Sequence, residues 1–493
     1  MIAVVAKPSD HDVVREFFEL FKTPWRFYEE GCSHDVLLCA TDEIPASCAK
    51  LIVLCGATSH PASAGRPTGQ TIVSLGVDLF SDVRHLLTRG QPRADAAVPT
   101  LDLRIDTLRR AMVDHGIAVL EIPPVPKGYN FIACLTHDVD HARVRYHKWH
   151  PAMLGFVYRA TVVSLVNVLR GRKRAGHLLA NSRAVFSLPF VLLNRAPDFW
   201  DQFRRYVEIE RGAASTFFFV PQRGETGLDA HGRRRRARAV RYSLNDVGDD
   251  LKALQAAGKE IGVHGIDAWR DSAKGGEEFA AIQQRTSGEE LGVRMHWLFF
   301  DENSPARLEQ AGFAYDSTVG YNDTVGYRAG TAQVYKPLAV ERLLELPLHV
   351  MDTALFYPSY LHLTDDEAES VIAPLLEHAS RGRGVLTVNW HDRSLGPERL
   401  WDRPYLRLLE SMRARNAWFA TAGDAVRWFR KRRSAQFEIA ADGAALQVKL
   451  SPPADDDLPP LQLRTYHPRV PDDSPAAFTD SPLATDERLL VAA

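Results

Sequence analysis

Six short apolar runs between residues 131 and 392 constrain the fold of this chain most. Nearly every run carries His, Asp or Arg within it or directly after it, and helix-like segments such as 246–257 and 304–311 fill the intervals. In a parallel α/β barrel the carboxyl ends of the strands meet on one face, where active sites lie. The sequence therefore predicts such a barrel, with polar side chains gathered at one edge. The predicted strands are 131–138, 215–221, 260–265, 293–300, 343–351 and 385–392.

The 493-residue chain is too long for one ordinary core, so more than one domain is expected. Residues 1–125 alternate apolar runs with helix-like segments, which favours a small α/β domain whose role is unknown. A Pro- and Gly-rich stretch, 121–130, predicts the boundary. The barrel is expected over 126–433, with a basic helical insertion at about 142–198. A D-G turn signal predicts a small β appendage and flexible tail over 434–493.

The charge and the apolar segments bear on partners and location. A net charge of -2 offers no general attraction to nucleic acid, so none is expected as a partner. The first residues lack a basic region and a small-residue cleavage site, so cytoplasmic location is the expectation. Residues 151–174 join an apolar run, interrupted by Arg159, to the basic stretch RGRKR. A packed helix that covers the barrel is the favoured interpretation, and peripheral membrane contact is the alternative.

The stretch THDVDH, residues 136–141, follows the first apolar run of the predicted barrel. Asp138 and Asp140 are separated by one residue, so on an extended strand their side chains share a face. Two carboxylates in one pocket repel each other unless a cation lies beside them. With His264 and further histidines from neighbouring strands, an Asp/His set suits zinc or a similar divalent ion. The other carboxylate can then act as a general base on water.

On these residues, the chain from 131 to about 430 resembles the polysaccharide deacetylases of carbohydrate esterase family 4. Their NodB-homology domain is a distorted (β/α) barrel. THDVD resembles the first family motif with one residue inserted, which implies that Asp138 is the catalytic base and Asp140 a metal ligand. EIGVHG resembles the second motif and implies His264 as a further ligand. GVRMHW resembles the third, in which Arg294 would orient the base.

The last two motifs resemble LPLHVMD and LTVNWHD. The resemblance implies that His391 is the general acid and that Asp352 tunes it, with Glu345 as an alternative to Asp352. Where the family has a second histidine in its second motif, this sequence has Ala268. His296 is the best substitute as third metal ligand. The weaker candidates for that position are Asp267, His137 and water.

The resemblance implies a metal-dependent hydrolase that removes an acetyl group from an N-acetylated sugar of a polysaccharide or glycolipid, with Zn²⁺ as the expected ion. Since aromatic side chains favour sugars, Trp269, Trp297 and Trp390 are the expected substrate contacts. Two alternatives stay open. One is another carbon–nitrogen hydrolase on the same barrel, acting on a cyclic amide or ureide. The other is a metal-free barrel that binds glycan or organises an assembly.

Overall fold

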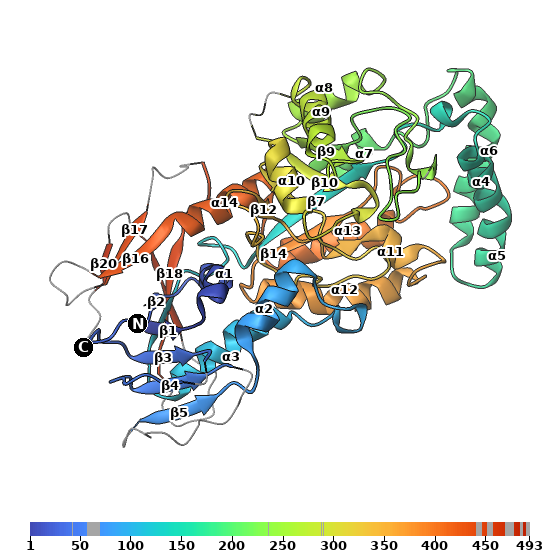
Figure 1. The fold of residues 1–493 in the computed structure, drawn as a ribbon. Helices are drawn as coiled ribbons and strands as arrows, with labels where there is room; N and C mark the ends of the chain where they lie inside the picture. The colour runs from blue at the N-terminus through green and yellow to red at the C-terminus, as the bar shows by residue number, and fades with distance from the viewer. Residues whose placement is uncertain are drawn as a thin grey trace.

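The structure is a computed structural model of the 493-residue chain (Figure 1). It describes every residue except 42, 57–69, 235, 287, 289, 440–445, 451–456, 469–477, 484–486 and 490–493. Three parts follow one another: an N-terminal α/β domain, a large parallel sheet wrapped by helices, and a β appendage. The order predicted for the fold is therefore confirmed.

The N-terminal domain holds a five-stranded sheet in the order β2-β1-β3-β4-β5, with every pair parallel. Its central strands are buried and rich in Val, Leu and Ile, which suits a parallel sheet covered by helices. The domain also packs on the barrel, because the side chains of Val319 and Tyr335 join its core. Its elements are β1 (Ile2–Val5), α1 (His11–Phe21), β2 (Trp25–Phe27), β3 (Val36–Cys39), β4 (Leu51–Leu54), β5 (Thr71–Ser74), α2 (Leu79–Thr88) and α3 (Thr100–Asp114).

The large sheet has nine strands, in the order β12-β11-β10-β9-β8-β7-β14-β13, with β15 also paired to β7. The strands at the two ends of this order are consecutive in sequence, since only four residues separate Glu345 from Val350. A connection that short spans at most about 18 Å, so the sheet must curl until its edges approach. This confirms the predicted distorted (β/α) barrel. The strands are β7 (Phe131–Val139), β8 (Thr216–Phe219), β9 (Glu260–Gly265), β10 (Gly292–Met295), β11 (Tyr315–Asp316), β12 (Leu344–Glu345), β13 (Val350–Met351), β14 (Val385–Asn389) and β15 (Ala417–Ala420).

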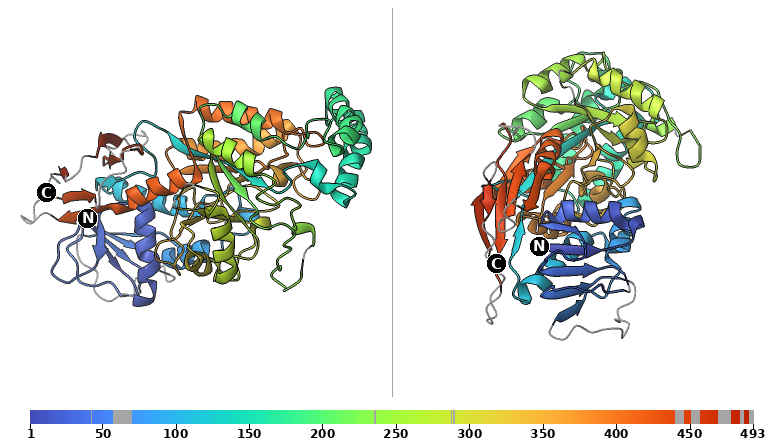
Figure 2. Two further views of the ribbon diagram at one scale, coloured as in Figure 1. Left: turned by 90° about the horizontal axis from the view of Figure 1, so that it is seen from above. Right: turned by 60° about the vertical axis from the view of Figure 1, so that its left-hand side comes forward.

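Two predicted strands are shorter than expected. The run 293–300 forms a strand only as far as Met295, and a tight turn follows in which Trp297 has φ +66°. The run 343–351 divides into β12 and β13 on either side of the 346–349 connection. Helices cover the outside of the sheet (Figures 1 and 2). They are α7 (Phe203–Ile209), α8 (Gly248–Ala256), α9 (Ser272–Gln283), α10 (Ser304–Ala311), α11 (Asp352–Phe356), α12 (Asp365–Ser380), α13 (Asp402–Ala414) and α14 (Ala422–Ser434).

The insertion between β7 and β8 is helical, as its composition predicts, and lies at one end of the molecule (Figures 1 and 2). It comprises α4 (Pro151–Tyr158), a single π turn (Arg159–Val163), α5 (Ser164–Leu169) and α6 (Ala175–Leu192). A small core of its own, with Met153, Phe156 and Leu188, holds these helices together. The helical stretch 151–169 packs on α6, while much of its other surface stays exposed.

The C-terminal appendage forms two small antiparallel sheets. One contains β16 (Ala435–Ile439), β17 (Leu446–Leu450) and β20 (Glu487–Leu489). The other joins β18 (Gln462–Tyr466) and β19 (Phe478–Pro482) to β6 (Val119–Glu121), which comes from the connection between the first two domains. The appendage thus ties the end of the chain to the domain boundary. Much of the predicted flexible tail lies outside the described residues.

Candidate active site

Side chains from β7, β9, β10, β13 and β14 meet at the carboxyl edge of the large sheet. Each lies at or just beyond the end of its strand, as expected for a parallel barrel. They line a cavity of about 390 Å³ that also receives loop residues such as Tyr360 and Arg399. The predicted site residues that line it are Asp138, Asp140, His264, His296, Trp297 and His391.

Asp138, near the end of β7, is held by two neighbours. Arg294 donates to its Oδ1 over 3.1 Å, and the side-chain amide of Asn389 donates to its Oδ2 over 2.7 Å. Burial alone would raise the pKa of Asp138, but the His264 imidazole and the Arg294 guanidinium hold that pKa below its usual value. The carboxylate is therefore ionised and fixed in orientation, which a general base requires.

Arg294 is fully buried and makes four hydrogen bonds from one guanidinium. Besides Asp138, it reaches the hydroxyl of Thr136 over 2.6 Å and the carbonyl and hydroxyl oxygens of Ser317 over 2.9 and 2.8 Å. Its plane lies over the ring of Phe218 at 4.7 Å. A guanidinium anchored on so many sides has little freedom, so the position of Asp138 depends directly on Arg294.

Asp140 lies between two imidazoles. Its Oδ1 is 3.4 Å from Nε2 of His264 and 3.4 Å from Nε2 of His296. The three ligand atoms lie within 4.8 Å of one another. Oδ1 of Asp140 is buried and has no hydrogen-bond partner among the described residues. A buried carboxylate oxygen is costly unless something satisfies it, and a cation at the centre of this group would do so.

Both imidazoles are placed to act as metal ligands. His264 donates Nδ1–H to the carbonyl of Arg294 over 2.9 Å, which leaves the Nε2 lone pair directed at Asp140. Burial lowers the pKa of His296 to about 3, so its ring is neutral. One carboxylate and two imidazoles match the three protein ligands of a catalytic zinc site, with a fourth position left for water. The residues present therefore fit a divalent ion.

His391 lines the same cavity and is paired with Asp352. Nδ1 of His391 is 2.6 Å from Oδ1 of the fully buried Asp352, and its Nε2 is 3.9 Å from Oδ2 of Asp140. Although burial alone would lower it, the Asp352 carboxylate raises the pKa of His391 to about 10. Ser394 also donates to Asp352, and Arg399 in turn donates to the Ser394 hydroxyl over 3.0 Å. The pair is thus part of a wider buried network.

The weaker ligand candidates lie elsewhere. His137 alternates with Asp138 on β7 and so faces away from the cavity, where its Nε2 is 2.8 Å from Glu210. Asp267 accepts a hydrogen bond from the backbone of Leu228 over 3.0 Å and pairs with Arg270. Ala268 is fully buried in the barrel core. Glu345, the alternative to Asp352, accepts from the backbone of Val319 over 2.8 Å and does not line the cavity.

The three tryptophans differ in placement. Trp297 is 39% exposed and lines the cavity. Trp390 is fully buried, stacks on Tyr405 and donates its indole N–H to the carbonyl of Trp401 over 3.2 Å. Trp269 is 4% exposed and packs in the barrel core. Alternation along β14 explains why Trp390 points away from the cavity. Successive side chains face opposite sides of the sheet, and Asn389 takes the side toward Asp138. Of the three, the structure brings only Trp297 to the cavity.

Among the residues that were not predicted from the sequence, Asn389 and Arg238 position predicted side chains of the site. Asn389 contacts both the side chain and the backbone of Asp138. Besides donating to the carboxylate, its side-chain oxygen accepts from the backbone N–H of Asp138 over 3.2 Å. Arg238 belongs to the basic run 231–241, and although a run of like charges is typical of a solvated loop, Arg238 is fully buried. It donates to the carbonyl oxygens of Ile266 over 2.9 Å and His296 over 3.1 Å, and so fixes the turn that presents His296.

The fold and these side chains define a class: a parallel α/β barrel with a candidate metal-binding site at its carboxyl edge. Neither the scan against protein-family models nor the search of curated proteins finds a match. Among solved structures, a protein from Mycobacterium smegmatis assigned to the polysaccharide deacetylases is similar, at 16% identity and a TM-score of 0.36, over 62% of this chain and 94% of that one. An allantoinase matches with 16% identity and a TM-score of 0.36, over 62% and 92%. A protein from Pseudomonas aeruginosa PAO1, also assigned to the polysaccharide deacetylases, gives 16% and 0.36, over 61% and 92%.

Proposed function

We propose that this chain is a cytoplasmic, metal-dependent hydrolase that removes the acetyl group from an N-acetylated sugar of a polysaccharide or glycolipid. The observation that carries the proposal is the convergence of Asp140, His264 and His296 on one point, beside an oriented carboxylate and a carboxylate-paired imidazole. Hydrolysis of an amide needs these three components: an electrophilic centre, a base and an acid.

Asp140, His264 and His296 would hold the ion. When bound, a divalent ion such as zinc polarises a carbonyl oxygen and lowers the pKa of its water to about 7. The backbone carbonyl of Arg294 sets the tautomer of His264, and its guanidinium orients Asp138. Arg294 thus orients both a metal ligand and the base.

Asp138 would take the proton of the attacking water. Its carboxylate is ionised, and each of its oxygens accepts one hydrogen bond, Oδ1 from Arg294 and Oδ2 from Asn389. Asp138 also lines the cavity, where water and substrate would enter. Holding the base in one orientation reduces the reorganisation needed when the proton moves.

His391 would give a proton to the departing nitrogen. An amine is too basic to leave as an anion, so amide cleavage needs a general acid. Asp352 accepts Nδ1–H of His391, which keeps the ring protonated and leaves Nε2 facing the cavity. Trp297 would provide an apolar face for the sugar ring at the same opening.

The test is acetate release from N-acetylated oligosaccharides by purified protein whose metal content is known. Asp138→Asn should reduce the rate by roughly 10²–10⁴, the usual contribution of a general base. Asp271→Asn is the matched control, because Asp271 only caps α9 through the backbone N–H groups of Ala273 and Lys274. Its rate should equal that of the wild type.

The same experiment separates the two rival functions. Metal-loaded protein that releases no acetate but opens a cyclic amide or ureide would replace the deacetylase with another carbon–nitrogen hydrolase. If the protein holds no divalent ion and binds the oligosaccharide without hydrolysing it, the glycan-binding module is favoured.

A further inference from the structure

The helical insertion exposes an unusual concentration of large apolar side chains. Of the eighteen described large hydrophobic residues that are exposed, eleven lie between residues 149 and 193. Exposed apolar side chains scattered singly are normal, but a concentrated patch marks an interaction site. The eleven are Trp149, Leu154, Tyr158, Val162, Leu165, Val166, Leu169, Leu179, Phe186, Phe190 and Leu193.

These side chains form stripes at helical spacing. Along the continuous helical stretch 151–169, Leu154, Tyr158, Val162, Leu165 and Leu169 recur at intervals of three or four residues, so they share one face. The opposite face carries Met153, Phe156 and Ala160, which are buried in the insertion core. Each side of the helix is thus apolar, but only one is covered.

The second helix of the insertion repeats this arrangement. Leu179, Phe186, Phe190 and Leu193 follow one exposed face of α6 and its C-terminal end, and Phe186 is 80% exposed. The two helical stretches pack against each other through their buried faces. The uncovered stripes therefore belong to one rigid unit.

The charge of the insertion is of one sign. Between Ala142 and Pro197 the sequence has ten Lys and Arg and no Asp or Glu. The turn that joins the two helical stretches carries RGRKR, in which Arg170 and Arg174 are exposed and form no ion pair with any described residue. Apolar helix faces flanked by Lys and Arg fit the surface of a bilayer with anionic headgroups.

The length of the helical stretch 151–169 raises the question of a membrane span. Among the described residues it is long and apolar enough to cross a bilayer, with mean hydropathy 1.6 and 22% of it buried. However, Arg159 at its middle pairs with Glu398 of a barrel loop over 3.0 Å, and Lys173 just beyond it pairs with Asp365 over 3.2 Å. These contacts hold the helix along the barrel, which fits a position on the membrane surface.

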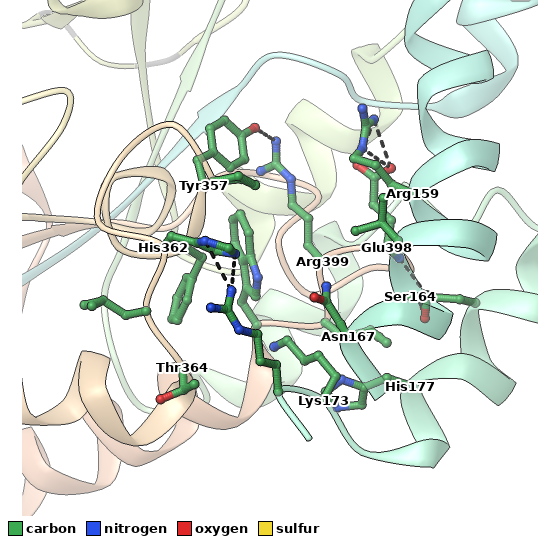
Figure 3. A pocket seen from close by; sticks show the side chains of 18 of the residues that line it. Arg159, Ser164, Asn167, Lys173, His177, Tyr357, His362, Thr364, Glu398 and Arg399 are labelled. Carbon is green, nitrogen blue, oxygen red and sulfur yellow. Dashed lines mark hydrogen bonds and ion pairs between the residues drawn. The ribbon is translucent and has the colours of Figure 1, made fainter. Parts of the chain in front are cut away.

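The insertion also borders a cavity that shares lining residues with the candidate active site. A cavity of about 460 Å³ lies between it and the barrel loops, with Arg159, Lys173 and His177 on one side and Tyr357 and Arg399 on the other (Figure 3). Tyr357 and Arg399 line the active-site cavity as well. The insertion therefore lies beside the active-site cavity.

From these observations we propose that the helical insertion docks the protein on the surface of an anionic lipid bilayer. The exposed stripes enter the headgroup region, and the basic turn contacts the lipid phosphates. Docking depends on the insertion alone and does not require the chemistry proposed for the barrel.

The test is co-sedimentation of the full chain with vesicles of mixed phosphatidylglycerol and phosphatidylcholine, compared with phosphatidylcholine alone. The wild type should bind the anionic vesicles, and high salt should weaken the binding. Leu165→Asp and Phe186→Asp should each weaken it roughly tenfold or more, because a charge replaces an inserted apolar group. Arg170→Gln and Arg174→Gln should each weaken it roughly fivefold.

Val371→Asp on α12 and Leu406→Asp on α13 are the matched controls, since both residues are 37% exposed and lie outside the insertion. They should bind as the wild type does. Thermal unfolding identifies any variant that does not fold, and the arginine variants then still decide the outcome. Failure of the wild type to bind anionic vesicles overturns the proposal. So does wild-type binding by Leu165→Asp and Phe186→Asp, or an equal affinity for neutral vesicles.

Discussion

The imidazole of His391 donates Nδ1–H to Oδ1 of Asp352 over 2.6 Å, and the backbone N–H of His391 donates to Oδ2 of the same carboxylate over 2.8 Å. One buried carboxylate thus fixes the ring, its tautomer and its backbone together. In the proposed reaction, Asp352 is a positioning residue for the general acid.

Replacement of Asp352 by Asn should therefore affect the departure of the amine. We expect Asp352→Asn to lower kcat on an N-acetylated sugar by roughly 10²–10³, within the range of general acid catalysis. An activated aryl acetate has a leaving group that needs no proton, so its hydrolysis should fall far less. Comparison of the two substrates with the same preparation checks this. An equal loss on both would show that Asp352 serves another purpose.

Trp297 should contribute to substrate binding more than to chemistry. It is exposed at the cavity, and its indole can stack on a sugar ring. We expect Trp297→Ala to raise KM roughly three- to tenfold with kcat little changed, from the usual energy of an aromatic contact. Trp149→Ala is the control, because Trp149 is 77% exposed on the insertion. A fall in kcat with unchanged KM in Trp297→Ala would contradict the assignment.

A buried ionic network behind β7 gives a prediction on stability. Glu210 lies 2.8 Å from Nε2 of His137 and 3.1 Å from Nζ of Lys259, and it accepts hydrogen bonds from Ser215 and Tyr405. Burial alone would raise the pKa of Glu210, but the His137 imidazole and the Lys259 ammonium lower it to about 2. A carboxyl whose pKa is lower in the folded state stabilises that state above the unfolded pKa of 4.5.

At pH 7, Glu210→Gln should lower the free energy of unfolding by on the order of 3 kcal/mol. The difference from the wild type should shrink as the pH falls from 4.5 toward 2, because the wild type loses this contribution in that window. Urea unfolding at pH 7 and pH 3 measures both values. Glu208→Gln on the same helix is the control, since Glu208 is 53% exposed. A difference that grows on acidification would contradict the assigned charge state.

Much of the barrel could be predicted because its long strands have distinct patterns. The apolar run that leads into Asp138 forms β7, and the spacing of Asp138 and Asp140 places both carboxylates at one cavity. By contrast, the two-residue strand β11 was not predicted, because it is too short to show a period, and it becomes visible only through its pairing with β10 and β12. The hydrophobic period of a sequence thus locates a strand or helix only when that strand or helix spans several residues.

The parts of the site that could not be predicted depend on turns and burial. His296 was a predicted ligand, but the turn that presents it to Asp140 was not predicted. The chain leaves the strand after Met295 and Trp297 takes φ +66°, which does not follow from alternation along a strand. Arg238 stands in a run of like charges, where only the folded structure shows that one guanidinium is buried. The exposure of the insertion helices, likewise, depends on how they pack.

The proposed hydrolysis depends on one divalent ion held by Asp140, His264 and His296, and the metal content of the protein after dialysis measures whether this ion is bound. The wild type should retain one ion per chain, and Asp140→Asn, His264→Asn and His296→Asn should each retain roughly tenfold less. Asp267→Asn, which keeps an oxygen to accept from Leu228, should retain as much as the wild type. A wild type without metal, or a His296→Asn variant that holds its ion while Asp267→Asn loses it, would contradict the account.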